Sequence, residues 1–194
     1  MKAAVLIDGG HLRICAKTAG KDYDPAFIER FALGCVQTDE YLLRVLYYDS
    51  PQYRGKVQLP VSGGTTNFQA NDNWLRELAK KDRFAVRRGT LAFRGWTPKS
   101  VPVSGKGLQD SDFKPNFEQK GVDMRLGLDI ATISDRRSVD RIIVVSADTD
   151  MIPAMKHARK AGIEIVIVET DPCQLKLHDQ LLAHADEKRI VKLP

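Results

Sequence analysis

The chain has 194 residues, of which 43% are hydrophobic and 28% charged, and its formal net charge is +5. This composition excludes a disordered or fibrous protein, and the length fits one α/β domain spanning residues 1–194. No apolar run approaches the roughly 20 residues that cross a bilayer, and the N-terminus lacks a signal-peptide pattern. We therefore expect a cytoplasmic protein with no membrane partner.

Signals for strands and helices alternate along the chain. Buried strands are predicted at 2–8, 41–48, 85–93, 141–146 and 163–168, with an edge strand at 189–193. Helices are predicted at 12–19, 24–36, 66–81, 122–133, 150–160 and 173–184. Residues 95–118 lack periodicity and are rich in Gly, Pro, Ser and Lys, which predicts a mobile loop on the substrate side. Strands separated by helices require right-handed crossovers, so the pattern predicts a mainly parallel sheet covered on both faces.

The three cysteines, Cys15, Cys35 and Cys173, are odd in number and widely separated. They form no C-x-x-C pair, so the spacing indicates neither a disulfide framework nor a zinc site. We expect buried or idle thiols.

Acidic residues follow the predicted strands. Asp8 ends the first strand, Asp148 and Asp150 follow the strand at 141–146, and Asp123 opens the helix at 122–133. The carboxyl edge of an α/β sheet is where such folds bind ligands. Carboxylates that gather without cations repel one another, so a divalent metal among them is the favoured explanation.

Each acid also has a purely structural interpretation. Asp8-Gly9 is a common turn pair, Asp150 is placed to cap the following helix, and Asp123 is placed to complement a helix dipole. Four turn or cap acids, however, have no reason to converge on one edge of a sheet. Their joint placement favours the metal site.

A basic segment lies between Ala79 and Gln109. It holds one acid, Asp82, and eight cations: Lys80, Lys81, Arg83, Arg87, Arg88, Arg94, Lys99 and Lys106. Phe84, Phe93 and Trp96 are interleaved with them. Mixed cations and aromatic rings are typical of surfaces that grip phosphates and unpaired bases, so we expect Arg83, Arg87, Arg88, Arg94, Trp96 and Lys99 to contact nucleic acid. The competing interpretation is a solvated edge hairpin.

Three motifs resemble the NYN domain, the LabA-like branch of the PIN-like nucleases. They are Asp8-Gly9-Gly10-His11-Leu12, the stretch from Lys120 to Asp129 (KGVDMRLGLD), and the stretch from Val145 to Pro153 (VSADTDMIP). The likeness extends over nearly the whole chain. It implies a PIN-like, Rossmann-like three-layer α/β/α sandwich, dependence on Mg²⁺ or Mn²⁺, and ribonuclease activity, with RNA, single-stranded by preference, as the partner.

Carried over position by position, the resemblance places the catalytic metal site at Asp8, Asp123, Asp148 and Asp150. Ser146 and Thr149 become supporting polar groups, and Lys120 is placed to hold a flanking phosphate. The first motif departs from the family pattern D-G-x-N, because His11 occupies the Asn position. Histidine also donates hydrogen bonds, but it is bulkier and titrates near neutrality, so substrate positioning is the step most affected. Asp129 lies six residues beyond Asp123 and faces another direction, which favours a structural or supporting role.

Several alternatives compete with this hypothesis. An aspartyl phosphotransferase of the HAD type also has D-x-D after a strand, but there the motif follows the first strand. A TOPRIM domain requires Glu at the first strand, where this chain has Asp8. The strongest rival is a nucleic-acid-binding or scaffold protein that keeps the fold and the acids without turnover. The sequence does not reveal which RNA is the natural substrate or whether the chain prefers RNA to DNA. It also leaves open whether cleavage is endonucleolytic or exonucleolytic and whether the chain forms a homo-oligomer.

Overall fold

The computed structural model describes residues 1–103 and 107–194. In chain order the elements are β1 (Lys2–Asp8), α1 (Gly9–Thr18), α2 (Pro25–Gly34), β2 (Tyr41–Asp49), β3 (Gly55–Gln58), β4 (Thr65–Phe68), α3 (Asn73–Leu78), β5 (Phe84–Arg88), β6 (Thr90–Pro98), the 3₁₀ turn η1 (Asp110–Asp112), β7 (Phe113–Lys120), α4 (Val122–Asp135), β8 (Arg141–Val145), the 3₁₀ turn η2 (Thr149–Met151), α5 (Ile152–Lys160), β9 (Glu164–Asp171), α6 (Asp179–Leu182) and β10 (Glu187–Lys192).

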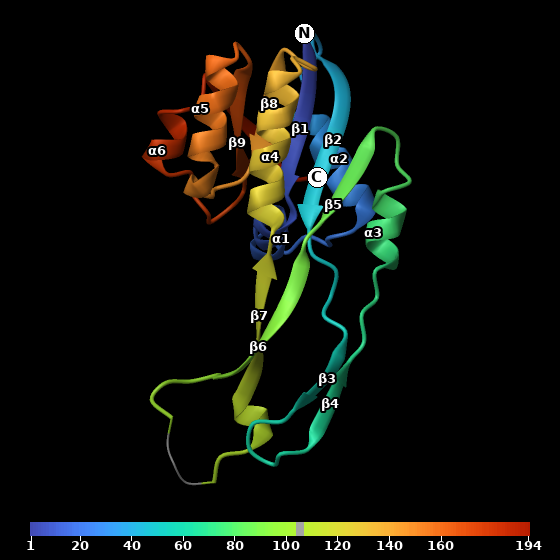
Figure 1. Cartoon of the computed structure of the whole chain (residues 1–194), viewed down its shortest axis with the longest axis vertical. Coiled ribbons are helices and arrows are strands. Elements are labelled where there is room, and N and C mark those ends of the chain that lie inside the picture. Colours follow the sequence, from blue (N-terminus) through green and yellow to red (C-terminus); the bar gives the residue numbers. More distant parts are fainter. Residues whose placement is uncertain (104–106) are drawn as a thin grey trace.

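A six-stranded sheet with the order β10-β9-β8-β1-β2-β5 forms the centre of the protein. All five strand pairings in it are parallel. Its central strands are apolar on both faces because helices cover both faces, as is usual for parallel sheets. The predicted α/β/α sandwich with a mainly parallel sheet is confirmed (Figure 1).

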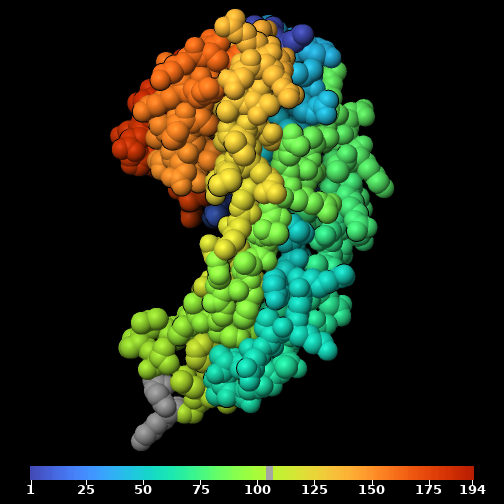
Figure 2. Space-filling model, viewed as in Figure 1, coloured from blue at the N-terminus to red at the C-terminus, as the bar shows by residue number. Residues whose placement is uncertain are grey.

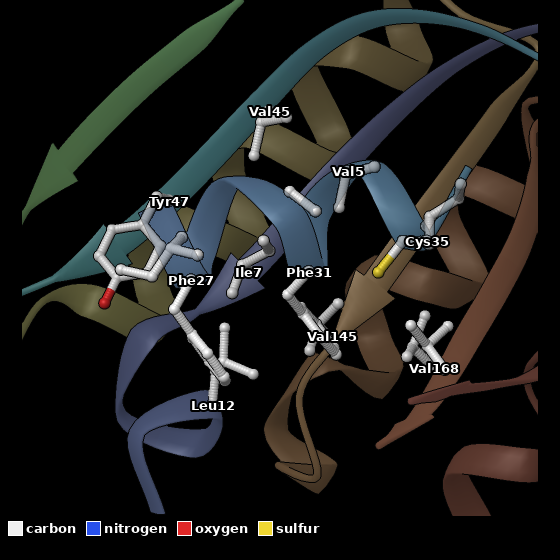
Figure 3. Close-up of a cluster of buried hydrophobic side chains, with 14 of the residues drawn as sticks. Val5, Ile7, Leu12, Phe27, Phe31, Cys35, Val45, Tyr47, Val145 and Val168 are labelled. Carbon is white, nitrogen blue, oxygen red and sulfur yellow. The ribbon is translucent and has the colours of Figure 1, made fainter. Parts of the chain in front are cut away.

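Two hydrophobic layers hold the sandwich together. On one face α1, α2 and α3 pack against the sheet, and Figure 3 shows Val5 and Ile7 of β1, Val145 of β8 and Phe31 of α2 in this layer. On the other face α4, α5 and α6 cover side chains such as Leu6 and Val144. Because side chains alternate along β1, neighbouring residues enter opposite layers. Full burial of one such side chain stabilises the fold by about 1.5–3 kcal/mol.

An arm leaves the carboxyl edge of the sheet and extends away from the core (Figures 1 and 2). It consists of two antiparallel hairpins, β3–β4 and β6–β7. Five aromatic rings between the hairpins form its core, with neighbouring centroids 5.4–6.4 Å apart: Tyr53, Phe68, Phe93, Trp96 and Phe117. Such pairs contribute about 0.5–1.5 kcal/mol each beyond area burial, so the arm has a small core of its own.

The structure of the arm differs from three predictions made from the sequence. The helix expected at 66–81 is the strand β4 followed by the shorter α3. The strand expected at 85–93 breaks at Gly89, where a Cβ would lie 2.7 Å from the carbonyl oxygen of Lys120 and 2.6 Å from Val122 Cγ2. The segment 95–118, expected to be an irregular loop, begins in β6 and ends in β7. Residues 104–106 of that segment lie outside the described residues.

Two further expectations were wrong. The helix predicted at 173–184 is confined to the four residues of α6, and residues 173–178 before it form no helix or strand. Cys15 and Cys173 form a disulfide with a Cα–Cα distance of 4.8 Å, within the range for such bonds, so they are not idle thiols. Only Cys35 is a free, buried thiol. No helix in the described part of the chain combines the length and the apolar character that crossing a membrane requires.

Candidate active site at the carboxyl edge of the sheet

The ends of β1 and β8 bring two of the sequence motifs together. These strands are parallel neighbours, with Ile7 beside Val145. The residues that follow, Asp8 and Ser146, therefore leave the sheet at the same edge. Ser146 is only 2% exposed. Its hydroxyl donates to Asp8 Oδ2 at 3.3 Å and accepts from the Asp148 amide at 3.1 Å. Ser146 thus ties the first motif to the third.

Asp8 also caps the helix that follows it. Its Oδ1 accepts hydrogen bonds from the amides of Gly10 at 2.9 Å and His11 at 3.2 Å. Burial raises the pKa of Asp8, although these hydrogen bonds oppose the shift. The cap explains the local conformation, and Oδ2, which among the described residues accepts only from Ser146, keeps a lone pair for another ligand.

The third motif forms the turn η2 between β8 and α5. Asp148 caps this turn, with its Oδ1 accepting from the Asp150 amide at 2.9 Å. Asp148 is half-buried, and Asp150 is exposed in the first turn. The expectation that Asp150 caps the following helix is wrong, because Asp148 caps η2 and the N-cap residue of α5 is Met151. Within the described residues, the Asp150 carboxylate forms no hydrogen bond and no ion pair.

Asp123 completes the group from the start of α4. Its side chain is exposed. Burial raises the pKa of Asp123, and the charges of Asp148, Asp8 and Asp150 raise it further. Asp123 therefore shares an electrostatic environment with the other three acids. In the described chain no lysine, arginine or histidine forms an ion pair with any of the four.

The four carboxylates are not assembled around a metal position. Across residues 1–103 and 107–194, no three histidine, cysteine, aspartate or glutamate side chains are grouped closely enough to hold an ion. The acids gather at one edge and repel one another, but binding a cation here requires side-chain rotation or water among the ligands.

Among the supporting residues, His11 differs from the expectation. Its side chain lies on α1 with Nε2 3.7 Å from Cys15 Sγ, and the residue is 6% exposed. Burial lowers the pKa of His11 to about 4. The ring is therefore neutral at pH 7 and does not titrate near neutrality as the sequence suggested. Lys120 is exposed at the end of β7, three residues before Asp123, and Thr149 is half-buried in η2.

Asp129 belongs to a different face of α4. It accepts a hydrogen bond from the Tyr48 hydroxyl at 2.9 Å and pairs with Arg87 at 2.9 Å. These contacts fasten α4 to β2 and β5, which agrees with the structural role favoured for Asp129.

The structure divides the candidate nucleic-acid residues. Arg83 lies at the opposite, amino edge of the sheet, where it donates to the Leu42 carbonyl at 2.7 Å and stacks over Tyr41. Arg87, Arg88 and Arg94 lie nearer the arm but pair with Asp129, Asp72 and Glu118. Trp96 belongs to the aromatic core of the arm and donates to the Gln58 carbonyl at 2.7 Å, whereas Lys99 is exposed. Lys106 lies outside the described residues.

One acid at this edge was missed by the sequence analysis. Asp49 ends β2, the strand beside β1, and is 2% exposed. It pairs with Arg13 and accepts a hydrogen bond from the Tyr47 hydroxyl at 2.9 Å. Burial raises the pKa of Asp49, while Arg13 opposes the shift. The available signal was the same as for Asp8, an acid directly after a buried strand.

Comparisons with known proteins place the chain in a family. The family model described as NYN domain matches residues 2–187, nearly the whole chain. Searches of curated proteins and of solved structures each found no match. The three motifs that carried the resemblance lie inside the matched region.

Proposed function

Because this chain belongs to the NYN domain family of PIN-like nucleases, we propose that it is a metal-dependent ribonuclease that hydrolyses phosphodiester bonds. One structural observation carries the proposal. Asp8, Asp123, Asp148 and Asp150 gather at the carboxyl edge of the sheet, and no basic side chain in the described chain is paired with them. Unpaired acids in that position raise the energy of the folded protein unless a cation joins them.

The donor set fits Mg²⁺ or Mn²⁺. All four side chains offer carboxylate oxygen, the ligand type that these hard cations take, and Mg²⁺ commonly keeps several waters beside one or two carboxylates. One or two of these carboxylates and several waters can therefore hold the ion, and the four carboxylates need not all contact it. A bound divalent cation would lower the pKa of a water and offset negative charge on the phosphate.

The chain's own residues supply the remaining tasks. Ser146 fixes the carboxylate of Asp8 and the backbone of Asp148 relative to each other. Asp150 and Asp123 are exposed, so either is free to accept a proton from the attacking water. Lys120, three residues before Asp123, is placed to attract a flanking phosphate. A single RNA strand is the preferred substrate, because its backbone is flexible enough to enter the junction of core and arm.

A single substitution tests the proposal. Asp148→Asn keeps the size of the side chain and a cap oxygen but removes one charge from the acid cluster. We expect cleavage of labelled single-stranded RNA with Mn²⁺ to fall by more than about a hundredfold, since losses of 10–100-fold are typical even for groups that only support metal ligands. Far-UV circular dichroism and thermal melting should show that the variant is folded.

Asp82→Asn is the matched control, because Asp82 is exposed beside β5 at the amino edge of the sheet. Its cleavage rate should equal that of the unmodified chain. Equal cleavage by the Asp148 variant would contradict the proposed site. RNA binding without turnover by the unmodified chain, with either Mg²⁺ or Mn²⁺, would instead favour the non-catalytic binding protein.

A further inference from the structure

A cleft of about 570 Å³ opens beside the acid cluster, a size typical of sites for small ligands. It is formed by residues from α1, β2, α3 and the arm. Its lining consists of Arg13, Tyr23, Asp49, Ser50, Gln52, Trp74, Leu91 and Gln119.

The cleft begins where the acid cluster ends. Asp49 directly follows Tyr48, the residue of β2 that pairs with Asp8. A Cβ added at Gly9 would lie only 2.8 Å from Asp49 Oδ2, so the backbone after Asp8 packs against this lining residue of the cleft. A Cβ at Gly10 would lie 3.2 Å from Asp8 Oδ1 and 3.6 Å from Gln119 Oε1. Gln119, which lines the cleft, therefore lies near the backbone that follows Asp8.

The walls of the cleft are aromatic and aliphatic. Trp74 and Tyr23 meet edge to face with centroids 6.3 Å apart, and Trp74 and Tyr47 form a second T-shaped pair at 6.1 Å. Leu91 of β6 is also part of the lining. The neighbouring rings fix the orientation of Trp74, so a flat ligand can stack on it without ordering it first.

The polar groups of the cleft suit a neutral ligand. Arg13 and the buried Asp49 neutralise each other, so Arg13 is not a free cation for phosphate. Gln119 Nε2 donates to Asp49 Oδ1 at 3.5 Å and Gln52 Oε1 accepts from the Asn71 amide at 3.3 Å. Each side chain keeps at least one N–H donor and one acceptor lone pair for a ligand. The Ser50 hydroxyl is buried and has no hydrogen-bond partner among the described residues. Its oxygen has almost no accessible surface, so the amides of Gln52 and Gln119 are the groups that a ligand in the cleft can reach.

We propose that this cleft takes one unpaired nucleobase of the RNA, from a nucleotide beside the phosphate that is cut. The base stacks on Trp74, and the amides of Gln52 and Gln119 read its hydrogen-bonding edge. Flat aromatic rings with donors and acceptors on one edge are recognised in this way in single-stranded RNA. The inference rests on the proposed function and adds to it that cleavage depends on the base at one fixed position.

Binding can be measured without cleavage. Trp96→Phe leaves Trp74 as the sole tryptophan of the chain and keeps a ring in the core of the arm. The probes are four 2′-O-methyl tetraribonucleotides, one for each base, with Ca²⁺ in place of Mg²⁺. We expect one of them to quench Trp74 fluorescence with an affinity about five- to tenfold above the others, the effect of one or two net hydrogen bonds. Anisotropy of labelled oligonucleotides on the unmodified chain gives the same ranking if Trp96→Phe perturbs the arm.

Gln119→Ala should bring the four affinities close together, whereas Gln69→Ala, an exposed glutamine outside the cleft lining, should leave the preference unchanged. Equal binding of all four probes, or a preference that survives Gln119→Ala, would overturn the inference even if the chain cleaves RNA. A chain that discriminates the probes through Gln119 but never cleaves RNA would overturn the proposed function and leave the base site standing.

Discussion

At the scale of single residues, Glu40 shows how a buried charge is held in this fold. Its side chain is buried at the amino edge of the sheet between Arg141 and Arg189. Arg189 donates to both carboxylate oxygens at 3.0 and 3.1 Å, and the Gln37 amide donates at 2.7 Å. Burial alone raises the pKa of Glu40, but the hydrogen bonds from Arg189, Gln37 and Arg141 outweigh it and hold the pKa at about 2.

Glu40→Gln should therefore destabilise the protein by about 3 kcal/mol at pH 7, because the two buried guanidinium groups lose the carboxylate that lies between them. Among the described residues, Arg141 then keeps only Glu164 and Glu187 as acidic partners, and Arg189 keeps only Glu187. The pKa of Glu40 is lower in the folded than in the unfolded state. Its stabilisation is present above the unfolded value of about 4.5 and is lost as the pH falls toward 2. Urea unfolding from pH 7 down to pH 3 measures the difference between variant and unmodified chain. A difference that does not shrink below pH 4.5 would contradict this origin of the stability.

The placement of the acidic residues was largely predictable from sequence. Asp8 and Asp148 follow strongly apolar runs, and parallel strands direct their carboxyl ends to the same edge. His11 was not predictable, because the pKa of a histidine depends on burial that the sequence does not state. Gln119 joins the site only because β7 returns along the arm to Gly10, a contact between distant segments.

At the scale of elements, the strands β1, β2, β8 and β9 were predicted well, whereas β5 was not separated from β6 and the arm was not predicted. Strands of the parallel sheet are continuous apolar runs that few other structures explain. The strands β3 and β4 and the first part of β7 alternate exposed and half-buried residues, and the described arm strands contain no fully buried residue. Gly63-Gly64 between two alternating segments was a usable hairpin signal for β3–β4. For β6–β7 the connection is too long for a local turn signal.

The arm also defines a prediction about nucleic-acid binding. Lys99 and Lys114 are exposed on the β6–β7 hairpin, away from the arginines that pair with acids. Changing both to Gln should weaken RNA binding for every sequence and lower the salt slope of log K by up to ~0.7 per lost contact. Titrations at several salt concentrations with Ca²⁺ measure the slope. The matched control changes Lys156 and Lys160 of α5 to Gln, and an equal effect there would indicate attraction by net charge alone.

At the scale of the whole molecule, long-range pairing sets the limit of what sequence reveals. The Cys15–Cys173 disulfide joins residues 158 positions apart, and only the fold brings them together. The same holds for the way the arm joins the core (Figure 2). Local patterns predicted the layers of the sandwich, because each layer is encoded within single elements. They did not predict that the β6–β7 hairpin and the loop that holds Cys173 both contact α1.

The acid cluster couples metal binding to the stability of the whole protein. In the metal-free chain, burial is the largest cause of the raised pKa of Asp123, and the charges of Asp148, Asp8 and Asp150 raise it further. The ionised acids therefore destabilise one another. Mg²⁺ or Mn²⁺ should therefore raise the melting temperature of the unmodified chain, corresponding to about 2.7 kcal/mol at a concentration one hundred times Kd. Asp148→Asn should melt at or above the temperature of the unmodified chain without metal, because one repelling charge is gone, and should gain much less from added metal. Asp82→Asn should respond to metal like the unmodified chain. If metal stabilises Asp148→Asn and the unmodified chain equally, the ion binds elsewhere and the four carboxylates are not its site.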